Sequence, residues 1–336
     1  MLLNKLDCKI LMNKKFSLMI LGLTVIFMLG AVSAFSGSGA GSSGNPYQIT
    51  NCDQLQEMNN NLAANYILVN DIDCSATSTW NSGAGFVPIS LFTGTFFDGQ
   101  NHIITNLFIN RPSVVSGSYI GLFGKITTGT EIKNVGLVNV KITGDYMVGG
   151  LVAYMEYSGA IIHSYVTGSV TGNNYVGGLV GQSYFGTITN SYATDSVTAS
   201  DHPVGGLVGE NMGAITNCYA TGRVTGSSMV GGLIGNNYID WLHTHYGTVT
   251  SSYWDTQTSG QSTSADGIGK TTAEMKTQST FVGWDFTHIW SINSHENNGY
   301  PYFSVEPTSV VPEFGLIAGI TTVLGALGVF FIVRKK

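Results

Sequence analysis

The chain has 336 residues, 44 glycines and a formal net charge of −6, and only 10% of its residues are charged. Between residues 35 and 311, 7 Lys and Arg stand against 18 Asp and Glu, a net charge of 7 − 18 = −11. Nucleic acids and anionic lipids are bound through clustered basic residues, so this composition argues against both and we expect no nucleic-acid partner. Ser, Thr and Asn carry much of the polar character, and these residues favour turns and strands.

Residues 1–34 have the pattern of a secretory signal peptide. Two lysines precede an apolar run from Phe16 to Val32, and small residues follow up to Ala34. A basic flank, a short apolar stretch and a small-residue end are typical of a signal that is cleaved on export. A retained membrane anchor is the alternative.

Three cysteines lie beyond this segment. Cys52 and Cys74 are separated by about one turn of the repeat described next, and an exported chain can oxidise such a pair. A disulfide between them and two free thiols are both open. Cys218 occupies the serine position of a repeat, which indicates a structural substitution rather than a nucleophile.

A Val-Gly-Gly-Leu motif recurs through the middle of the chain. Its copies begin at Val148, Val176, Val204 and Val230, and a shorter relative begins at Ile120. Counted in residue numbers, the steps are 28, 28, 28 and 26. Self-similarity at a fixed period of 20–50 residues is typical of stacked repeat architectures. Blades of a β-propeller usually need about 40 residues, so this period is too short for that fold.

A second motif, Asn-Ser-Tyr with variations, runs in step with the first. It places Tyr165, Tyr192, Tyr219 and Tyr253 in equivalent positions, among short strand-favouring segments punctuated by glycine. We therefore predict an all-β fold, a right-handed parallel β-helix of about 28-residue coils with three short strands each. Stacking then places Asn190 over Asn217 and aligns the tyrosines in one file.

These repeats resemble the GLUG-motif family of bacterial and archaeal surface and adhesin-like proteins. The resemblance extends upstream to the strings at 44–49 and 70–73 and downstream to those at 272–276 and 300–303. It implies N-terminal β-helix coils over 35–119, GLUG-type repeats over 120–259 and a C-terminal cap over 260–303 that covers the last rung. It implies a cell-surface location more firmly than any molecular activity.

The repeat is interrupted once, by about seven extra residues. The step from Tyr219 to Tyr253 is 34, whereas the two earlier tyrosine steps are 27. Insertions in solenoids loop out from one face, often the binding face. We predict a ligand-contact loop here, and an inert or shielding loop is the alternative; its candidate residues are Tyr238, Asp240, Trp241, His243 and His245.

Enzymatic chemistry finds little support in the sequence. A glycosidase needs two carboxylates about 5–9.5 Å apart, yet the acids of the repeats fall at different phases, which indicates solvated surface residues: Glu131, Asp145, Glu156, Asp195, Asp201, Glu210, Asp240 and Asp255. The string 295–299 lacks the second histidine of a metallopeptidase motif. Asp71 and Asp73 form only part of a calcium loop, so turn aspartates are the preferred interpretation. No cofactor and no metal are predicted.

The C-terminal end predicts a membrane-spanning segment. Residues 315–333 carry no charge and are 19 in number, about enough to cross a hydrocarbon core of ~30 Å, and a basic cluster follows at 334–336. The positive-inside rule then places the repeats outside the cell. A linker with a Pro-Glu-Phe tripeptide occupies 304–314, and the sorting tail occupies 315–336; the tripeptide is Pro312, Glu313 and Phe314.

The tripeptide, apolar span and basic tail together resemble the PEF-CTERM sorting signal of archaeal surface proteins. That resemblance implies an archaeosortase-type processing enzyme as a partner, which removes the tail and leaves a lipid anchor. A simple tail anchor is the alternative. We thus expect a non-enzymatic, membrane-anchored surface protein, adhesin-like or structural, with glycans or proteins of the cell surface as partners. The alternative function is a surface-anchored polysaccharide lyase or hydrolase.

Overall fold

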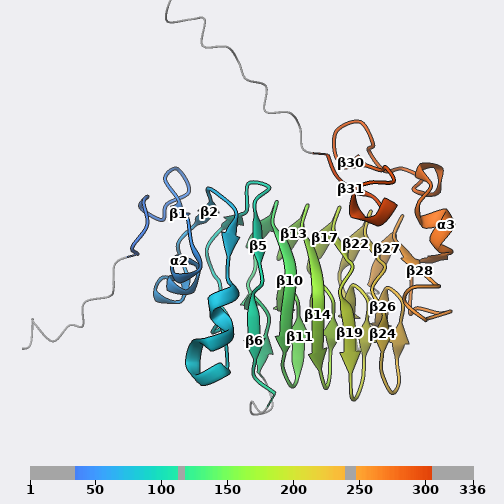
Figure 1. Ribbon diagram of the computed structural model, residues 1–336, viewed down its shortest axis with the longest axis horizontal. Coiled ribbons are helices and arrows are strands. Elements are labelled where there is room, and N and C mark those ends of the chain that lie inside the picture. The colour runs from blue at the N-terminus through green and yellow to red at the C-terminus, as the bar shows by residue number, and fades with distance from the viewer. Residues whose placement is uncertain (1–34, 113–117, 239–246, 305–336) are drawn as a thin grey trace, which may run out of the picture.

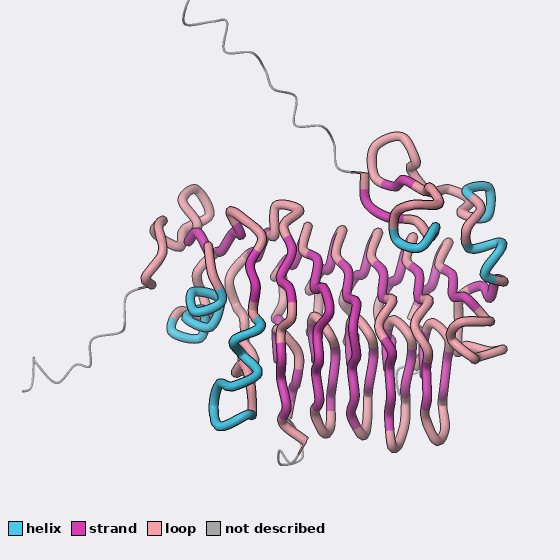
Figure 2. The backbone as a smooth tube through the Cα atoms, in the orientation of Figure 1, coloured by secondary structure: helices cyan, strands magenta, loops and turns pink. Residues whose placement is uncertain are grey.

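The computed structural model describes residues 35–112, 118–238 and 247–304, and within them the chain winds into a parallel β-solenoid (Figure 1, Figure 2). Rungs lie side by side along the long axis of the molecule. Val148 pairs with Val176, Val176 pairs with Val204, and Gln182 bonds to Glu210, so each of these rungs advances by 28 residues. The predicted all-β parallel solenoid with coils of about this length is confirmed. Its right-handed sense stays a prediction.

The chain visits four parallel sheets in each full rung. Sheet 1 has eight strands, in the order β1 (Tyr47–Ile49), β2 (Tyr66–Leu68), β4 (Phe96–Asp98), β9 (Glu131–Lys133), β13 (Ala160–Ile162), β17 (Thr187–Thr189), β22 (Ala214–Thr216) and β27 (Thr248–Thr250). Sheet 2 has eleven, namely β29 (Ile268–Lys270), β28 (Tyr253–Asp255), β23 (Tyr219–Ala220), β18 (Tyr192–Ala193), β14 (Tyr165–Gly172), β10 (Gly136–Thr143), β5 (Ile103–Thr105) and β3 (Ile72–Asp73), with β19 (Ser196–Ala199), β24 (Val224–Thr225) and β6 (Phe108–Asn110) off this path.

Sheets 3 and 4 divide the Val-Gly-Gly-Leu motif between them. Sheet 3 consists of β25 (Val230–Gly231), β20 (Val204–Gly205), β15 (Val176–Gly177), β11 (Met147–Gly149) and β7 (Tyr119–Ile120). Sheet 4 consists of β26 (Ile234–Asn237), β21 (Val208–Asn211), β16 (Val180–Ser183), β12 (Val152–Met155) and β8 (Phe123–Ile126). The expectation of three strands per coil is therefore wrong, because the paired glycines turn the chain through a corner in mid-motif.

Close approach of backbones is the reason for glycine at this corner. A Cβ on Gly177 would lie 1.9 Å from the carbonyl oxygen of Val180, and one on Gly178 would lie 2.3 Å from that of Gly206 in the next rung. The first glycine thus lets the chain turn, and the second lets two rungs touch. The leucine that follows is fully buried in four successive rungs: Leu151, Leu179, Leu207 and Leu233.

A second corner joins sheet 1 to sheet 2 and explains the asparagine of the Asn-Ser-Tyr motif. Asn190 and Asn217 have φ angles of 46° and 54°, in the left-handed region that asparagine tolerates well. Thr189 pairs with Thr216, so the asparagines that follow them are stacked as predicted. Asn134, His163 and Ser251 take the same left-handed conformation in other rungs, and we call these five residues the corner column.

The N-terminal end is closed by a helix tied to the solenoid by a disulfide. Helix α2 (Cys52–Glu57) leads into the 3₁₀ turn η1 (Met58–Asn60), and a longer 3₁₀ segment, η2 (Ser75–Gly83), follows β3. Cys52 and Cys74 form a disulfide with their Cα atoms 5.3 Å apart. Cys218 is free and fully buried, and burial raises the pKa of its thiol to about 12. This environment fits a structural residue rather than a nucleophile.

Removing the disulfide is expected to lower the free energy of unfolding by about 2–3 kcal/mol, because the bond restricts the unfolded chain. Cys52→Ser combined with Cys74→Ser is the variant, and urea unfolding with and without reductant is the measurement. In the wild type, reductant lowers the transition midpoint. The variant loses that response, while Cys218→Ser retains it. A wild-type midpoint that does not respond to reductant would contradict the prediction.

The C-terminal cap, residues 271–304, contains little regular structure. It contains helix α3 (Thr272–Met275), the 3₁₀ turns η3 (Gln278–Thr280) and η4 (Asn297–Gly299), and an antiparallel pair formed by β30 (Trp290–Ser291) and β31 (Tyr302–Phe303). Figure 1 shows that it lies on the flank of the solenoid, over the ends of several late rungs. The loop before β29, which belongs to the range 260–303 expected to form the cap, contacts the last rung: Gly232 N–H donates to the carbonyl of Thr263, and Ala265 N–H donates to that of Ile234.

Candidate functional site

Most residues of the predicted contact loop and the whole predicted sorting tripeptide lie outside the described part of the chain. In the inserted loop Tyr238 is described and is 43% exposed, whereas Asp240, Trp241, His243 and His245 are not described. The sorting tripeptide at 312–314, the signal segment 1–34 and the tail 315–336 also lie outside the described ranges. Within those ranges no helix has the length and apolar character needed to cross a membrane.

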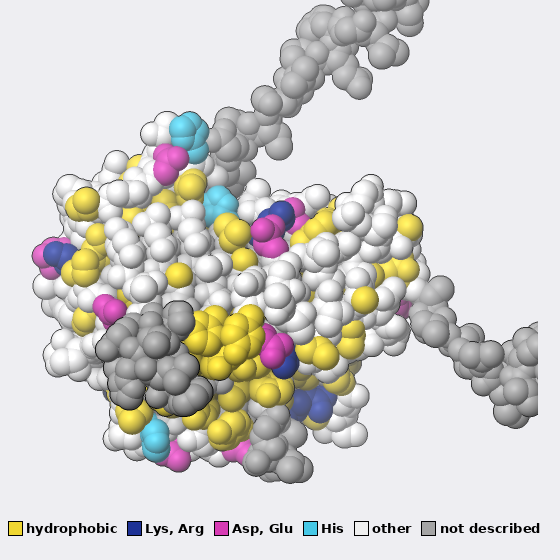
Figure 3. All heavy atoms as spheres, turned by 180° about the vertical axis from the view of Figure 1, so that it is seen from behind, with side chains coloured by type: hydrophobic (Ala, Val, Ile, Leu, Met, Phe, Trp, Pro, Cys, Tyr) yellow, Lys and Arg dark blue, Asp and Glu magenta, His cyan; other side chains and the backbone are white. Residues whose placement is uncertain are grey.

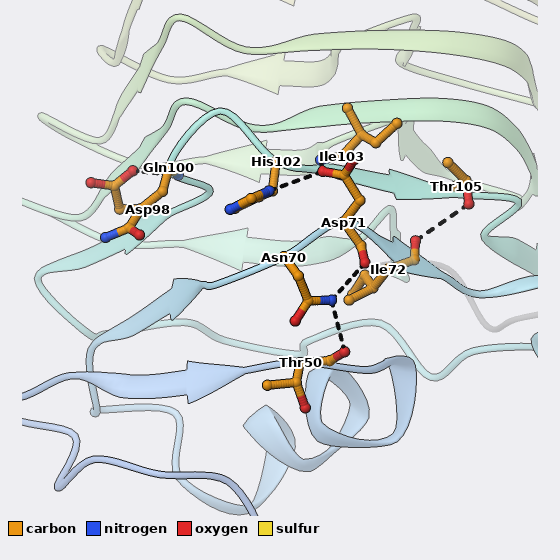
Figure 4. Close-up of polar contacts among 9 residues, drawn as sticks. All are labelled: Thr50, Asn70, Asp71, Ile72, Asp98, Gln100, His102, Ile103 and Thr105. Carbon is orange, nitrogen blue, oxygen red and sulfur yellow. Dashed lines mark hydrogen bonds and ion pairs between the residues drawn. The ribbon is translucent and has the colours of Figure 1, made fainter. Parts of the chain in front are cut away.

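Asp71 and Asp73 hold neighbouring rungs together, and Figure 4 shows Asp71 beside His102 and Ile103 of the next rung. Asp71 Oδ1 accepts hydrogen bonds from Ile103 N–H and from the His102 ring, each at 3.0 Å. Asp73 Oδ1 accepts from Asn106 Nδ2 at 2.9 Å, and this bond and those from Ser75 lower the pKa of Asp73. Among the described residues no group of three or more His, Cys, Asp or Glu is arranged to hold a metal ion.

A file of stacked tyrosines runs along the outer side of sheet 2. The rings of Tyr165 and Tyr192 stack at 4.7 Å and 6°, and those of Tyr192 and Tyr219 at 4.8 Å and 8°. Tyr219 pairs with Tyr253 in the next rung. The predicted tyrosine file is confirmed, and its spacing is the distance between neighbouring strands.

The cap is built on this tyrosine file. Tyr219 is fully buried; its hydroxyl donates to the carbonyl of Pro301 at 2.5 Å and accepts from Asn297 Nδ2 at 2.7 Å. One rung further on, the hydroxyl of Tyr300 donates to the buried carboxylate of Asp255 at 2.8 Å. Indole rings of the cap complete the contact, with Trp290 about equally close to Tyr192 and Tyr219 at 6.1 Å.

Tyr219→Phe is expected to loosen the cap without unfolding the rungs, because it removes two buried hydrogen bonds worth about 1–2 kcal/mol together. Hydrogen exchange read by mass spectrometry is the measurement. Amides of 271–304 exchange faster in the variant, while those of sheets 3 and 4 do not change. Tyr157→Phe, at a tyrosine that is 47% exposed, is the matched control. Uniformly faster exchange along the solenoid would contradict the prediction.

A cavity of about 310 Å³ lies where the tyrosine file emerges from under the cap. Its floor is formed by sheet 2 and the corner column, through Gly136, Tyr165 and Asn134. Its wall is formed by the cap, through Glu296, Asn297, Tyr302 and Phe303; the other lining residues are Asn101, Val135, His163, Thr167, Tyr192 and Ser304.

The file ends at this cavity because one rung lacks its tyrosine. Tyr165 pairs in register with Gly136, and a Cβ on Gly136 would lie only 2.4 Å from Cζ of the Tyr165 ring. The ring of Tyr165 therefore leans over a position without a side chain. Phe303 of the cap meets it edge-on at 6.0 Å and meets the His163 ring at 4.3 Å.

The cavity carries neutral side chains apart from one carboxylate. Burial raises the pKa of Tyr165, and the negative charge of Asp71 adds to the effect, so the phenol stays protonated. Burial lowers the pKa of His163, which keeps the imidazole neutral at pH 7. Glu296 is the one acid among the lining residues. A pair of carboxylates that flanks a glycosidic bond is thus not present in this lining.

Three acids of the repeats are not on the surface, contrary to the expectation from sequence. Asp195, Glu210 and Asp255 are 1%, 7% and 0% exposed. Asp255 is satisfied by Tyr300 and by two backbone amides, and Glu210 accepts from the amide groups of Gln182 and Asn236. Asp195 has no hydrogen-bond partner for either oxygen within the described residues.

The repeated rungs match a known family model. Residues 144–171, 172–198 and 203–225 each match the GLUG motif. These three rungs are GLUG repeats. Each match begins before a strand of sheet 3 and ends within sheet 2 of the following turn, so one motif corresponds to one rung.

Two curated relatives match part of this chain. Halomucin of Haloquadratum walsbyi is 42% identical over 156 residues, which are 43% of this chain and 2% of halomucin. A protein of Evansella cellulosilytica, named as a Gly-rich membrane protein, is 36% identical over 148 residues, 43% of this chain and 15% of the relative. The chain therefore spans only a small part of either protein.

A solved structure shares the fold. The crystal structure of a protein described as an immunoglobulin A1 protease from Bacteroides ovatus superposes with a TM-score of 0.57 and 22% sequence identity, over 80% of this chain and 94% of that chain. Identity at this level relates the two folds and nothing further.

The cavity was not predicted from the sequence, although one of the two features that create it is visible there. Asn134-Val135-Gly136 aligns with His163-Ser164-Tyr165, so glycine visibly replaces the tyrosine of the motif. The other feature is the position of Tyr302 and Phe303, which depends on how the cap folds back over the flank. No periodicity indicates that contact.

Proposed function

We propose that this chain is a non-enzymatic β-solenoid of the cell surface, adhesin-like or structural, held at the outer face of a membrane. The proposal rests on the GLUG rungs and on the sequence similarity of this chain to a halomucin and to a protein named as a membrane protein. The face in Figure 3 carries scattered acids and few basic groups, and its hydrophobic side chains gather most densely near the centre of the view. Partners on this view are glycans or proteins of the same surface.

The absence of paired acids in the cavity supports a role without catalysis. Glu296 is the single carboxylate among its lining residues, and the buried Asp255 is engaged by Tyr300. A binding or structural protein needs no such pair, whereas glycosidic cleavage by the usual mechanism does. A reducing-end assay on polysaccharide with the full chain is therefore expected to give no signal above buffer, and release of new ends would contradict the proposal.

Attachment is proposed to occur through the C-terminal sequence. The tripeptide at 312–314, the apolar run at 315–333 and the basic end at 334–336 form the sorting signal of an archaeal-type system. The partner is an archaeosortase-type enzyme that removes the tail and joins the new end to a lipid.

Protease treatment of intact cells tests location, and mass spectrometry of the native C-terminus tests processing. Surface location predicts that external protease digests the chain while a cytoplasmic marker survives. Processing predicts peptides that end before residue 315 and none that contains Arg334-Lys335-Lys336. Resistance of the chain in intact cells would contradict the surface location, and an intact C-terminus would leave a simple tail anchor in place of the sorting signal.

A further inference from the structure

We propose that the cavity between the tyrosine file and the cap binds one sugar ring of a surface glycan, stacked against Tyr165. The inference deepens the proposed surface function, because it assigns a ligand class and a site to a protein otherwise described only by its location. The site is formed entirely by described residues of the solenoid and the cap, away from the inserted loop.

The tyrosine stack ends at Tyr165 without a further aromatic ring. Tyr192 stacks on one face of the Tyr165 ring, whereas on the other face the outer part of the ring rests on the backbone of Gly136 and no further ring follows, so the ring borders the cavity there. The rings of Phe303 and Tyr302 border the same space from the cap. A flat, partly apolar ring placed here would extend the stack and remove apolar surface from water.

Polar groups line the rim of the cavity around the Tyr165 ring. Asn134 Nδ2 donates to Asp98 and Asn297 Nδ2 donates to Tyr219, yet neither amide oxygen has a hydrogen bond within the described residues. The side chain of Asn101 and the carboxylate of Glu296 likewise make no hydrogen bond there, so they remain available to a ligand. These groups accept and donate around the rim of the cavity.

A sugar satisfies both features at once, and a purely aromatic side chain does not. One face of a pyranose carries C–H groups that pack on an aromatic ring, while its hydroxyls donate and accept at the edge. An aromatic peptide side chain in the same place would bury the amides and the carboxylate without hydrogen-bond partners, which is unfavourable. A nucleotide or a sulfated sugar is disfavoured, because the one charged lining residue is acidic.

The volume limits the ligand to about one ring. A cavity of about 310 Å³ lies at the lower end of the range for small-molecule sites. Few contacts are available, so a dissociation constant on the order of 1 mM is expected for a single sugar. Useful affinity would arise when many copies of the protein contact one polysaccharide.

Saturation-transfer NMR on the full chain is the direct test. The probes are methyl β-glucopyranoside, methyl β-galactopyranoside, methyl α-mannopyranoside and N-acetylglucosamine, with phenol as the aromatic competitor. At least one sugar is expected to receive saturation mainly on the C–H protons of one face. Tyr165→Ala should weaken binding about tenfold, and Tyr165→Phe should retain it, because the ring face rather than the hydroxyl makes the contact.

Two further variants probe the floor and the rim of the cavity. Gly136→Ala places a Cβ 2.4 Å from the Tyr165 ring and should displace that ring, with a similar loss of binding. Glu296→Gln changes an exposed side chain that the fold does not need, so it retains the melting temperature and weakens binding a few-fold. Tyr157→Ala, at an exposed tyrosine that does not line the cavity, should leave binding unchanged.

Several outcomes would overturn the proposal. One is that no sugar receives saturation. Another is that phenol binds more tightly than every sugar, which identifies an aromatic peptide site. A third is that Tyr157→Ala weakens binding as much as Tyr165→Ala or Glu296→Gln does. Because these measurements use purified protein, a chain that binds sugar but resists protease on intact cells would refute the proposed location while the site stands.

Discussion

Asp195→Ala is expected to raise the free energy of unfolding at pH 8 by about 2–4 kcal/mol. The carboxyl group lies inside the solenoid, 1% exposed, and neither oxygen has a hydrogen-bond partner within the described residues. Register pairs Ser196 with Ser169 and Val197 with Val224, so the neighbouring rungs carry Gly168 and Gly222 at this position. Burial raises the pKa of Asp195 from 3.8 to about 7.

The direction of the pH effect follows from the raised pKa. Below pH ~4 the carboxyl is protonated in both folded and unfolded chains, so the group contributes no pH dependence. Between pH ~4 and ~7 the unfolded chain has lost the proton that the folded chain retains, and stability falls as pH rises. Above pH ~7 both states are ionised and the loss is complete, at about 4 kcal/mol for a shift of this size.

Urea unfolding between pH 4 and pH 9 measures this effect. The contribution of Asp195 to the wild type is expected to lower stability from pH 4 to pH 7 and then to level off. Asp195→Ala removes the part of the slope that Asp195 contributes, and Asp195→Asn removes the same part but gains less stability because an unpartnered polar group stays buried. Asp201→Ala, at an exposed aspartate, is the control that retains the slope. An unchanged slope in the alanine variant would refute the assignment.

Gly177→Ala is expected to destabilise the solenoid by more than ~3 kcal/mol or to prevent folding. The added Cβ would lie 1.9 Å from the carbonyl oxygen of Val180 and 2.7 Å from the amide nitrogen of Gly209. Both are backbone atoms of strands that are hydrogen-bonded to neighbouring rungs, so neither atom can move away from the added Cβ. Because each rung is stable only against its neighbours, a distorted corner also weakens the two rungs beside it.

Gly44→Ala is the matched control, since a Cβ there meets no atom within 4 Å. Soluble yield and thermal melting of the two variants are the measurements. We expect the Gly44 variant to match the wild type and the Gly177 variant to be insoluble or to melt far lower. Equal melting temperatures would mean that the corner can open, and that close backbone contact is not what selects glycine there.

The stacking of the rungs was predictable because a fixed period dictates register. Once Val148, Val176 and Val204 recur at equal steps, parallel pairing places equivalent residues together, and the tyrosine file follows from that alone. The repeat period did not predict side-chain direction where the regular alternation of a strand is interrupted. Between Leu137 and Val140 the register of sheet 2 shifts, and in a later rung the chain leaves β18 before it enters β19. Asp195 lies between these two strands, so the repeat period gave no indication that its side chain points inward.

The cap was visible in the sequence as a change of composition, but its docking site was not. Tyr219 and Asp255 select the position of the cap through hydrogen bonds to Pro301 and Tyr300, which are 82 and 45 residues away in the chain. Such contacts follow from the shape of the folded surface rather than from any local pattern. The pairing of Cys52 with Cys74 is an intermediate case, because their spacing is compatible with a bond without requiring one.

The number of rungs sets the distance between the cap and the gap in the tyrosine file. The cap is fixed to the rungs of Tyr219 and Asp255, while the gap in the tyrosine file is fixed at Gly136, two rungs beyond Tyr192. Deleting one complete rung with a Val-Gly-Gly-Leu corner would leave matching surfaces on either side, since the four such corners have the same glycines and leucine. It would also bring the gap one step closer to the cap and change the cavity. Copy number, which duplication and recombination alter readily in repetitive genes, thus decides whether such a molecule has this cavity at all.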